Sequence, residues 1–287
     1  MNRISSPDEL EKLRESIIKQ RDPNKPCIII CGGTGCLALG CERVITAFRQ
    51  EIGQQRLEAK VDIRITGCPG FCERGPLVVI KPQNIFYQRV REEDIPEIIS
   101  ETVLKGNIID RLLYPDPNTG KKIIYEPEVP FYKKQKRLII GNNELIDPTL
   151  IDDYLAVGGY AALTRVLFRM SPEEVIGEVK KSGLRGRGGG GFPTGVKWGT
   201  CRRAQGDTKY IICNCDEGDP GAFMDRSLME GNPHSVLEGM IIGAYAIGGH
   251  QGYIYVNKKG NQTNSLLPIA IKQAEEYGLL GNNILGS

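Results

Sequence analysis

The sequence predicts an α/β protein with two domains. Short apolar segments typical of strands alternate with amphipathic segments typical of helices, and 287 residues are enough for two hydrophobic cores. A glycine-rich run at 183–198 lies between a helical segment and an apolar strand of the second domain. We divide the chain into an N-terminal helix (1–25), a first domain (26–106), a connector (107–150) and a second domain (151–287).

The N-terminal helix has a clear start signal. Ser6 is suited to the N-cap, Pro7 to the first helical position, and Glu9 completes a capping box. One apolar stripe then follows the helix, made of Leu10, Leu13, Ile17 and Ile18. This stripe must pack against another part of the protein or a partner subunit.

The first domain reads as a small sheet with flanking helices. We expect strands at 27–31 and 61–65, a hairpin formed by 77–81 and 85–90, and helices at 42–54 and from Asp94 to just before Gly106. The order strand, helix, strand, strand, strand, helix is thioredoxin-like in outline.

The remaining chain is predicted as a connector and a second α/β layer. The connector carries four prolines and should contain at most short strands. In the second domain, Ser171 starts a helix with a capping box, a strand covers 209–213, and Ser235 caps a helix with Glu238 at its N3 position. A strand at 252–256 and a helix at 266–277 complete the domain.

Four of the nine cysteines form two pairs. Cys31 and Cys36 have four residues between them, Cys68 and Cys72 have three, and each pair lies in a glycine-rich turn just after a predicted strand. Loops at neighbouring strand ends can converge on one point. Thiolates on loops rich in backbone N–H groups suit an iron–sulfur cluster, either [2Fe–2S] or [4Fe–4S].

Two alternatives compete with a cluster. Zinc ribbons favour a C-x2-C spacing, which neither pair has. Four buried free thiols would be the structural alternative, and Cys41 could serve as a substitute ligand near the first loop.

The glycine-rich run has the composition of a cofactor loop. Its glycines let the backbone approach a ligand and turn N–H groups inward. Arg187 and Lys197 supply positive charge for a phosphate, and Phe192 and Trp198 offer flat apolar faces for a ring. A flexible linker is the alternative, but linkers are typically rich in serine and poor in bulky aromatics.

Acidic residues follow the strand at 209–213. Asn214, Asp216, Glu217 and Asp219 stand at a strand end, where α/β folds place ligands. Such groups can bind ribityl or ribose hydroxyls. Metal binding and a solvated acidic turn are the competing interpretations.

Composition excludes several classes of protein. The net charge is only +2 with Lys and Arg spread along the chain, which argues against a nucleic-acid partner. No apolar stretch reaches the roughly 18 residues of a membrane span, and no signal core opens the chain. We expect a cytoplasmic protein without direct membrane insertion, peripheral at most to a membrane complex.

Three segments together resemble the FMN- and NADH-binding subunit of respiratory complex I: 184–198, 214–226 and 277–281. With its first domain, the chain from about 26 to 287 is similar to subunits of soluble NAD-linked hydrogenases, electron-bifurcating hydrogenases and diaphorases. The resemblance implies a thioredoxin-like [2Fe–2S] ferredoxin domain followed by the N-terminal part of an α/β Rossmann-like FMN-binding domain.

The resemblance also implies roles for residues. The FMN phosphate and ribityl chain would be lined, and the FMN held, by Gly186, Arg187, Gly188, Lys197, Asn214, Asp216 and Glu217. Phe192 would stack on the nicotinamide side and Asp219 would lie near NADH. The [2Fe–2S] ligands would be Cys31, Cys36, Cys68 and Cys72. No catalytic side chain is expected, because the flavin carries the hydride chemistry.

The implied function is hydride transfer from NADH to FMN and then single-electron transfer to iron–sulfur subunits of a hydrogenase-, formate dehydrogenase- or complex I-like oxidoreductase. At 257–264 the chain departs from the family's usual Arg-Ala-Glu-Tyr-Pro. The chain ends before the second half of the flavin domain and the ligands of a [4Fe–4S] cluster, so we expect the N-terminal part of a longer protein with exposed apolar surface. The alternative function is a non-catalytic [2Fe–2S] relay module with a vestigial flavin domain.

Overall fold

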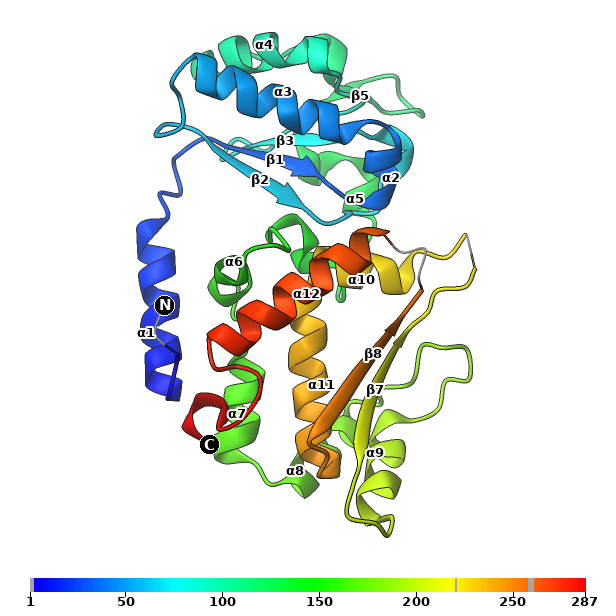
Figure 1. The fold of residues 1–287 in the computed structure, drawn as a ribbon. Coiled ribbons are helices and arrows are strands. Elements are labelled where there is room, and N and C mark those ends of the chain that lie inside the picture. The colour runs from blue at the N-terminus through cyan, green and yellow to red at the C-terminus, as the bar shows by residue number, and fades with distance from the viewer. Residues whose placement is uncertain (1–2, 220, 258–260) are drawn as a thin grey trace. The chain divides into compact units, whose positions relative to one another are not determined.

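The computed structural model describes residues 3–219, 221–257 and 261–287, shown in Figure 1. These residues form two compact units. The cysteine unit comprises 19–153 and 230–232. The glycine-loop unit comprises the residues up to Ile18, together with 154–229 and 233–287. Each unit is built around its own sheet.

The cysteine unit contains a four-stranded sheet in the order β2-β1-β3-β4. Strand β1 (Cys27–Cys31) pairs parallel with β2 (Asp62–Thr66) and antiparallel with β3 (Val78–Lys81), and β4 (Ile85–Tyr87) pairs antiparallel with β3. The strands lie close to the apolar segments that predict them. The parallel pairing places the carboxyl ends of β1 and β2 at one edge of the sheet.

The other elements of this unit are helices and two short strands. They are α2 (Thr34–Ala38), α3 (Cys41–Gln54), α4 (Ile95–Glu97) with its π-helical continuation Ile98–Val103, α5 (Pro130–Lys133), β5 (Tyr114–Pro115) and β6 (Lys122–Ile123). Helix α3 packs against β1 and α4.

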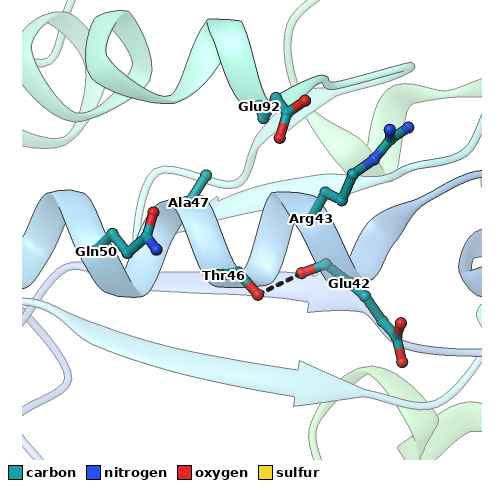
Figure 2. A pocket seen from close by; sticks show the side chains of 6 residues that line it. All are labelled: Glu42, Arg43, Thr46, Ala47, Gln50 and Glu92. Carbon is teal, nitrogen blue, oxygen red and sulfur yellow. Dashed lines mark hydrogen bonds between the residues drawn. The ribbon is translucent and has the colours of Figure 1, made fainter.

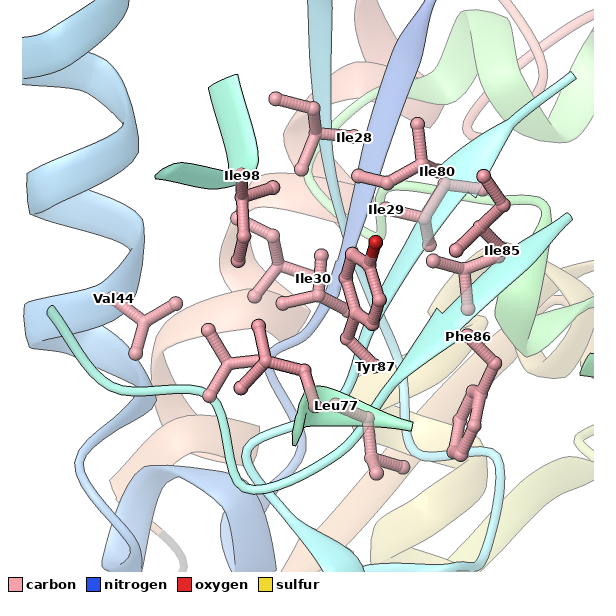
Figure 3. Packing of buried hydrophobic residues seen from close by; sticks show 14 of the residues in the cluster. Ile28, Ile29, Ile30, Val44, Leu77, Ile80, Ile85, Phe86, Tyr87 and Ile98 are labelled. Atoms are coloured by element: carbon pink, nitrogen blue, oxygen red, sulfur yellow. The ribbon is translucent and has the colours of Figure 1, made fainter. Parts of the chain in front are cut away.

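The core of the cysteine unit lies between the sheet and these helices. Figure 3 shows isoleucines of β1 and β3 meeting Tyr87 of β4 and Val44 of α3. Ile28, Ile30 and Tyr87 are fully buried. Burying each such side chain contributes about 1.5–3 kcal/mol, which makes this core the main support of the loops at its edge.

The start of the helix after β4 agrees only in part with the prediction. Asp94 stands at the N-cap position of α4, as predicted, but its side chain makes no cap hydrogen bond to that helix. It is also the N3 residue of the preceding turn, and its Oδ2 accepts a hydrogen bond of 2.8 Å from the Arg91 backbone N–H. A 3-10 turn at Glu92–Asp94 precedes the helix. The carboxylate therefore still satisfies an N-terminal donor, but from inside the first turn.

Residues 107–150, which read as a connector, pack with the cysteine unit. Leu112, Leu113, Tyr114 and Tyr132 from this segment are buried in the same core as the sheet. Its strands are short, as predicted, with two residues each in β5 and β6.

The glycine-loop unit contains a two-stranded parallel sheet, β7 (Tyr210–Cys215) and β8 (Gln251–Val256). Helices account for much of the remaining chain: α1 (Pro7–Gln20), α6 (Ile151–Ala156), α7 (Ala161–Arg169), α8 (Pro172–Lys181), α9 (Thr194–Arg203), α10 (Met224–Gly231), α11 (Pro233–Ile247) and α12 (Asn261–Glu276). Alternation of strand and helix confirms the α/β class.

Helix α11 is the support of this unit, and α9 and β7 both pack against it (Figure 1). A Cβ on Gly243 would lie 3.0 Å from Ile211 of β7 and 3.2 Å from the Trp198 ring of α9. The edge of the Trp198 ring therefore takes part in the packing between helices, and its role toward a cofactor ring stays a prediction.

Two helix caps were predicted in the second domain, and one of them is confirmed. The Ser171 hydroxyl accepts from the Glu174 N–H, and the Glu174 carboxylate accepts from the Ser171 N–H, as the capping box predicts. Helix α11, however, begins at Pro233, so Ser235 lies inside it. Glu238 accepts instead from the Tyr154 hydroxyl and from the N–H groups of Tyr160 and Leu163.

The buried ring of His234 should make the stability of the glycine-loop unit depend on pH. The ring is 1% exposed, lies 2.9 Å from the Tyr160 hydroxyl and 3.1 Å from Gln273 Oε1, and burial lowers its pKa from 6.5 to about 4. The unfolded chain therefore binds this proton first. The contribution of His234 to the free energy of unfolding is fully present above pH 6.5. It should fall by about 1.4 kcal/mol per pH unit as the pH drops toward 4.

This expectation is measured by urea unfolding at pH 7.0, 5.5 and 4.5, followed by tryptophan fluorescence of the single Trp198. A His234→Gln chain should lose most of this slope between pH 6.5 and 4. Equal slopes in the two proteins would contradict the assignment to His234.

One face of the β7–β8 sheet is exposed. Tyr210, Ile212, Tyr253 and Tyr255 are each at least half exposed, and the rings of Tyr210 and Tyr253 lie 6.0 Å apart. This agrees with the expectation of exposed apolar surface in the second domain. Among the described helices, none combines the length and apolar character needed to cross a membrane.

Candidate functional site

The two cysteine loops meet at one edge of the four-stranded sheet. Cys31 ends β1, Cys36 lies in α2, and the loop that carries Cys68 and Cys72 follows β2. Cys68 Sγ is 3.3 Å from Cys72 Sγ, and the Cys31 thiol hydrogen-bonds with the thiols of Cys36 and Cys68. The structure thus brings together all four predicted ligands.

The four thiols perturb one another's pKa values. Hydrogen bonds from Cys31 and Cys72, together with the Gly70 N–H at 3.2 Å, lower the pKa of Cys68 far below that of a free thiol. The hydrogen bond from Cys31 also lowers the pKa of Cys36. The pKa values of the partners Cys31 and Cys72 are raised in return. The four sulfurs therefore lie close enough to share protons, and metals bind such thiols as thiolates.

Glycines leave room for the sulfurs. A Cβ on Gly35 would lie 2.8 Å from Cys72 Sγ, and one on Gly75 would lie 2.7 Å from Cys36 Sγ. A Cβ on Gly33 would lie 2.7 Å from the Cβ of Cys68. Side chains at these positions would displace the thiols, so the glycine-rich turns form a cradle around the quartet.

The donor set and its surroundings fit a cysteine-ligated iron–sulfur cluster, which takes four thiolates from loops rich in backbone N–H groups. Among the residues that the structure describes, no three His, Cys, Asp or Glu side chains are arranged for a single metal ion. The number of thiols and the two converging loops are the features that point to a cluster rather than to a single ion.

Cys41 differs from the quartet. It is buried at the start of α3, and burial raises the pKa of its thiol to about 12. This residue therefore packs as a neutral thiol, which is unlike the character of Cys68.

Several neighbours of the quartet were missed by the sequence interpretation. Phe131 of α5 stacks on Phe71 in the second cysteine loop, with ring centroids 4.4 Å apart and planes within 7°. Asn143 Nδ2 donates to the Cys68 carbonyl at 3.5 Å, and Thr34 donates to Glu230. The aromatic pair Phe131-Tyr132 among the prolines of the connector was the signal available in the sequence.

Gly35→Ala is expected to reduce cluster occupancy at least twofold and to destabilise the cysteine unit by about 1–3 kcal/mol, because the new methyl overlaps Cys72 Sγ. Iron per chain after reconstitution measures the first effect. Gly141→Ala is the matched control, since nothing lies within 4 Å of its Cβ position. Equal iron content in both variants would contradict the cradle.

The glycine run forms a closed loop in the glycine-loop unit. Its ends are joined by hydrogen bonds from Gly186 N–H to the Phe192 carbonyl and from Thr194 N–H to the Leu184 carbonyl, both 2.9 Å. Gly189 and Gly191 have positive φ, which favours glycine there. Nothing lies within 4 Å of a Cβ on Gly188, Gly189, Gly190 or Gly191, so the loop has open space around it.

Positive charge gathers at this loop. Arg187 and Lys197 are exposed, and Lys197 lies in the first turns of α9, which starts immediately after the loop. Free N–H groups at a helix N-terminus attract anions. Arg185 has a different role, because its Nη1 donates to the Gly191 carbonyl at 3.0 Å and holds the loop closed. Phe192 is 57% exposed, which leaves its ring face open.

Hydrogen bonds from nearby backbone N–H groups to side chains stabilise the acidic turn after β7. The Glu217 carboxylate accepts from the N–H groups of Met224, Asp225 and Arg226 at 2.6–3.2 Å, and so caps α10. Asn214 accepts from the Asp216 N–H at 3.1 Å, and Asp219 from the Gly221 N–H at 2.9 Å. These bonds shape the turn; the roles of its residues toward FMN or NADH stay predictions.

Two hollows can be compared with the predicted site residues. Figure 2 shows one of about 400 Å³ beside α3, lined by Glu42, Arg43, Thr46, Ala47, Gln50 and Glu92, none of them a predicted site residue. The other, of about 20 Å³, lies at the carboxyl ends of β7 and β8 beside Cys215, Glu217 and Arg226. The second is about the size of one water and coincides with the acidic turn. The divergent stretch at 257–264 lies partly outside the described residues, which omit 258–260.

Family models match both regions. Residues 16–103 match the thioredoxin-like [2Fe–2S] ferredoxin, and residues 179–284 match the Nuo51 FMN-binding domain. The first match contains all four cysteines of the quartet, and the second contains the glycine loop and the acidic turn.

Curated relatives match about half of this chain. An NADP-reducing hydrogenase subunit, HndC, of Solidesulfovibrio fructosivorans is 54% identical over 155 residues, which cover 54% of this chain and 31% of that protein. Corresponding subunits of the NADH-quinone oxidoreductases are 51% identical over 137 residues in Aquifex aeolicus and 41% over 141 in Escherichia coli, covering 48% and 49% of this chain and 32% of each relative. The matched part of this chain thus spans about a third of the length of these relatives.

Solved structures give weaker likenesses. The thioredoxin-like [2Fe–2S] ferredoxin of Aquifex aeolicus is 29% identical, covers 30% of this chain and 93% of its own, and has a TM-score of 0.29. An NAD+-reducing [NiFe]-hydrogenase chain is 21% identical, covers 95% of this chain and 44% of its own, and has a TM-score of 0.41. In order along the chain, residues 16–103 thus match a thioredoxin-like [2Fe–2S] ferredoxin and residues 179–284 match a Nuo51 FMN-binding domain.

Proposed function

We propose that this chain is an electron-transfer subunit that takes electrons from NADH at a bound FMN and passes them singly to iron–sulfur clusters. The observation that carries the proposal is the presence in one chain of a convergent four-thiol quartet and a Nuo51 FMN-binding match. When bound, FMN supplies the conversion between two-electron hydride chemistry and one-electron transfer. The residues of the protein bind, orient and polarise the cofactors.

In this proposal Cys31, Cys36, Cys68 and Cys72 hold the [2Fe–2S] cluster. The convergence of the two cysteine loops favours ligation, and the glycine cradle keeps the loops close enough for four ligands. The stacked rings of Phe71 and Phe131 cover the second loop and limit solvent access there.

The glycine loop would hold the flavin nucleotide. Gly186 and Gly188 allow backbone approach, while Arg187 and Lys197 pair with the phosphate at the start of α9. Asn214, Asp216 and Glu217 border the ribityl chain, the open ring of Phe192 stacks on the nicotinamide side, and Asp219 lies near NADH. Glu217 would do this indirectly, by fixing the turn through its cap on α10.

The partners are proposed from the relatives. HndC belongs to an NADP-reducing hydrogenase and the other two relatives to NADH-quinone oxidoreductases, so a hetero-oligomeric oxidoreductase with further iron–sulfur subunits fits this chain. The electron donor is NADH in the quinone oxidoreductases, and we propose the same nucleotide here. A cytoplasmic location, peripheral to any membrane complex, completes the proposal.

Arg187→Ala and Lys197→Ala should each weaken FMN binding about 10- to 100-fold, because a charge-assisted hydrogen bond contributes about 1.5–3 kcal/mol. Quenching of FMN fluorescence on titration with protein measures the dissociation constant. Lys181→Ala is the matched control, since that side chain is 79% exposed and pairs with Glu178. A uniform weakening in all three variants would contradict a specific phosphate site.

The proposal as a whole is tested by iron, acid-labile sulfide, zinc and FMN contents of the anaerobically reconstituted chain. Two irons, two sulfides and one FMN per chain are expected for the [2Fe–2S] flavoprotein. Iron and sulfide without FMN would favour the relay module. Zinc without sulfide would overturn the electron-transfer function.

A further inference from the structure

The segment Glu230–Gly231–Asn232 lies in the sequence of the FMN-binding domain, yet it belongs to the cysteine unit. Glu230 and Gly231 end helix α10, and Pro233 starts α11. Within the unit that carries the quartet, Glu230 and Gly231 lie beside the loops of the cysteines. They contact both cysteine loops.

The first contact is between Glu230 and the loop from Cys31 to Cys36. The Thr34 hydroxyl donates a hydrogen bond of 2.6 Å to Glu230 Oε2, and Glu230 is 5% exposed. Thr34 stands between Gly33 and Gly35, whose Cβ positions meet Cys68 and Cys72. The carboxylate is therefore anchored at the point where the first loop touches both cysteines of the second.

The second contact is between Gly231 and the loop after β2. A Cβ on Gly67, the residue before Cys68, would overlap the Cα of Gly231. A Cβ on Gly231 would in turn overlap the side chain of Asn143, which is fully buried and donates to the Cys68 carbonyl. This close backbone packing leaves little freedom for the segment to move away from the quartet.

From these contacts we propose that Glu230 is a positioning residue that tunes the [2Fe–2S] cluster, its buried negative charge lowering the cluster's reduction potential through the Thr34 loop. The inference rests on the proposed function. Adding one electron makes the cluster and its thiolates one charge more negative, so a buried anion nearby opposes reduction. The anion acts strongly because it is shielded from solvent and salt.

The test is an EPR-monitored redox titration of the full chain reconstituted with iron and sulfide. Glu230→Gln keeps the size and an acceptor for Thr34 but removes the charge. We expect it to favour the reduced cluster at least tenfold, which is an upward shift of about 59 mV for one electron. Glu73→Gln is the control, since Glu73 adjoins Cys72 but its side chain is 71% exposed and should be screened.

A second pair of variants tests the connection through Thr34. Thr34→Ser retains the hydroxyl and should keep the wild-type potential, whereas Thr34→Val should shift it in the same direction as Glu230→Gln. The double variant Thr34→Val with Glu230→Gln should shift less than the sum, because both changes act on one interaction. If Glu230→Gln does not retain the cluster, Thr34→Ser and Thr34→Val decide, and equal potentials in both overturn the inference.

The outcomes separate the two levels of the argument. A cluster signal in every variant with one common potential would overturn the role of Glu230 and leave the proposed function standing. No [2Fe–2S] signal in the wild-type chain would overturn both. An equal shift in the Glu73→Gln control would also overturn the role of Glu230, because any nearby charge would then have the same effect.

Discussion

Cys36→Ala and Cys68→Ala chains are expected to lose the [2Fe–2S] cluster, with iron and sulfide contents falling at least tenfold after reconstitution. Each change removes one of the four thiolates that the cluster requires. The loss should also destabilise the cysteine unit, since a bound cluster stabilises the folded state that holds it.

The control for this prediction is another cysteine of the same chain. Cys201→Ala changes a thiol in α9 of the glycine-loop unit and should leave iron and sulfide unchanged. Cys41→Ala tests the substitute ligand and should keep the cluster, because burial holds Cys41 as a neutral thiol. Full iron content in the Cys68→Ala chain would exclude it as a ligand.

Glu238→Ala is expected to destabilise the glycine-loop unit by on the order of 4 kcal/mol, a large effect for one residue. The carboxylate is buried and accepts three hydrogen bonds of 2.6–2.9 Å from the Tyr154 hydroxyl and two backbone N–H groups. Alanine would leave all three donors buried without an acceptor, and each such donor costs about 1–3 kcal/mol. It would also leave a cavity beside Tyr154 and Tyr160.

Thermal and urea unfolding measure this effect, and a shift of several kcal/mol lowers the midpoint by roughly 10 °C in a unit of this size. Glu178→Ala is the matched control, because that side chain is 54% exposed and pairs only with Lys181 at 3.3 Å. Its stability should stay within about 0.5 kcal/mol of wild type. Similar losses in the two variants would contradict the role of Glu238.

Local patterns predicted the cysteine unit well. The apolar segments at 27–31 and 77–81 could be recognised because a strand buried on both faces is apolar throughout. The convergence of the two cysteine loops followed from the parallel pairing of β1 and β2, whose carboxyl ends share one edge. These features depend on neighbouring residues and on general rules of sheet topology.

Long-range contacts were not predictable in the same way. Ser235 and Glu238 have the spacing of a capping box, but Pro233 starts the helix, and Glu238 finds partners at Tyr154 and Tyr160, about 80 residues earlier. Trp198 follows the glycine loop in sequence, yet its ring packs at Gly243. Nothing local distinguishes these side chains from exposed ones.

Some contacts around the candidate site were equally impossible to predict from the local sequence. The glycine loop could be recognised from its composition. In contrast, the contacts of Thr34 with Glu230 and of Asn143 with Cys68 join residues that are 196 and 75 positions apart in the sequence. Residues that support a site in this way have no motif, because their role is fixed by the fold that brings them together.

The most direct test of the central claim is the visible absorption spectrum of the anaerobically purified chain before and after NADH is added. We expect flavin bands at about 450 nm over a broad iron–sulfur absorption, and we expect NADH to bleach both, because it would supply electrons to a flavin and a cluster that this chain holds. Bands of a bound flavin and cluster that are indifferent to NADH would contradict the claim that this chain takes electrons from that nucleotide.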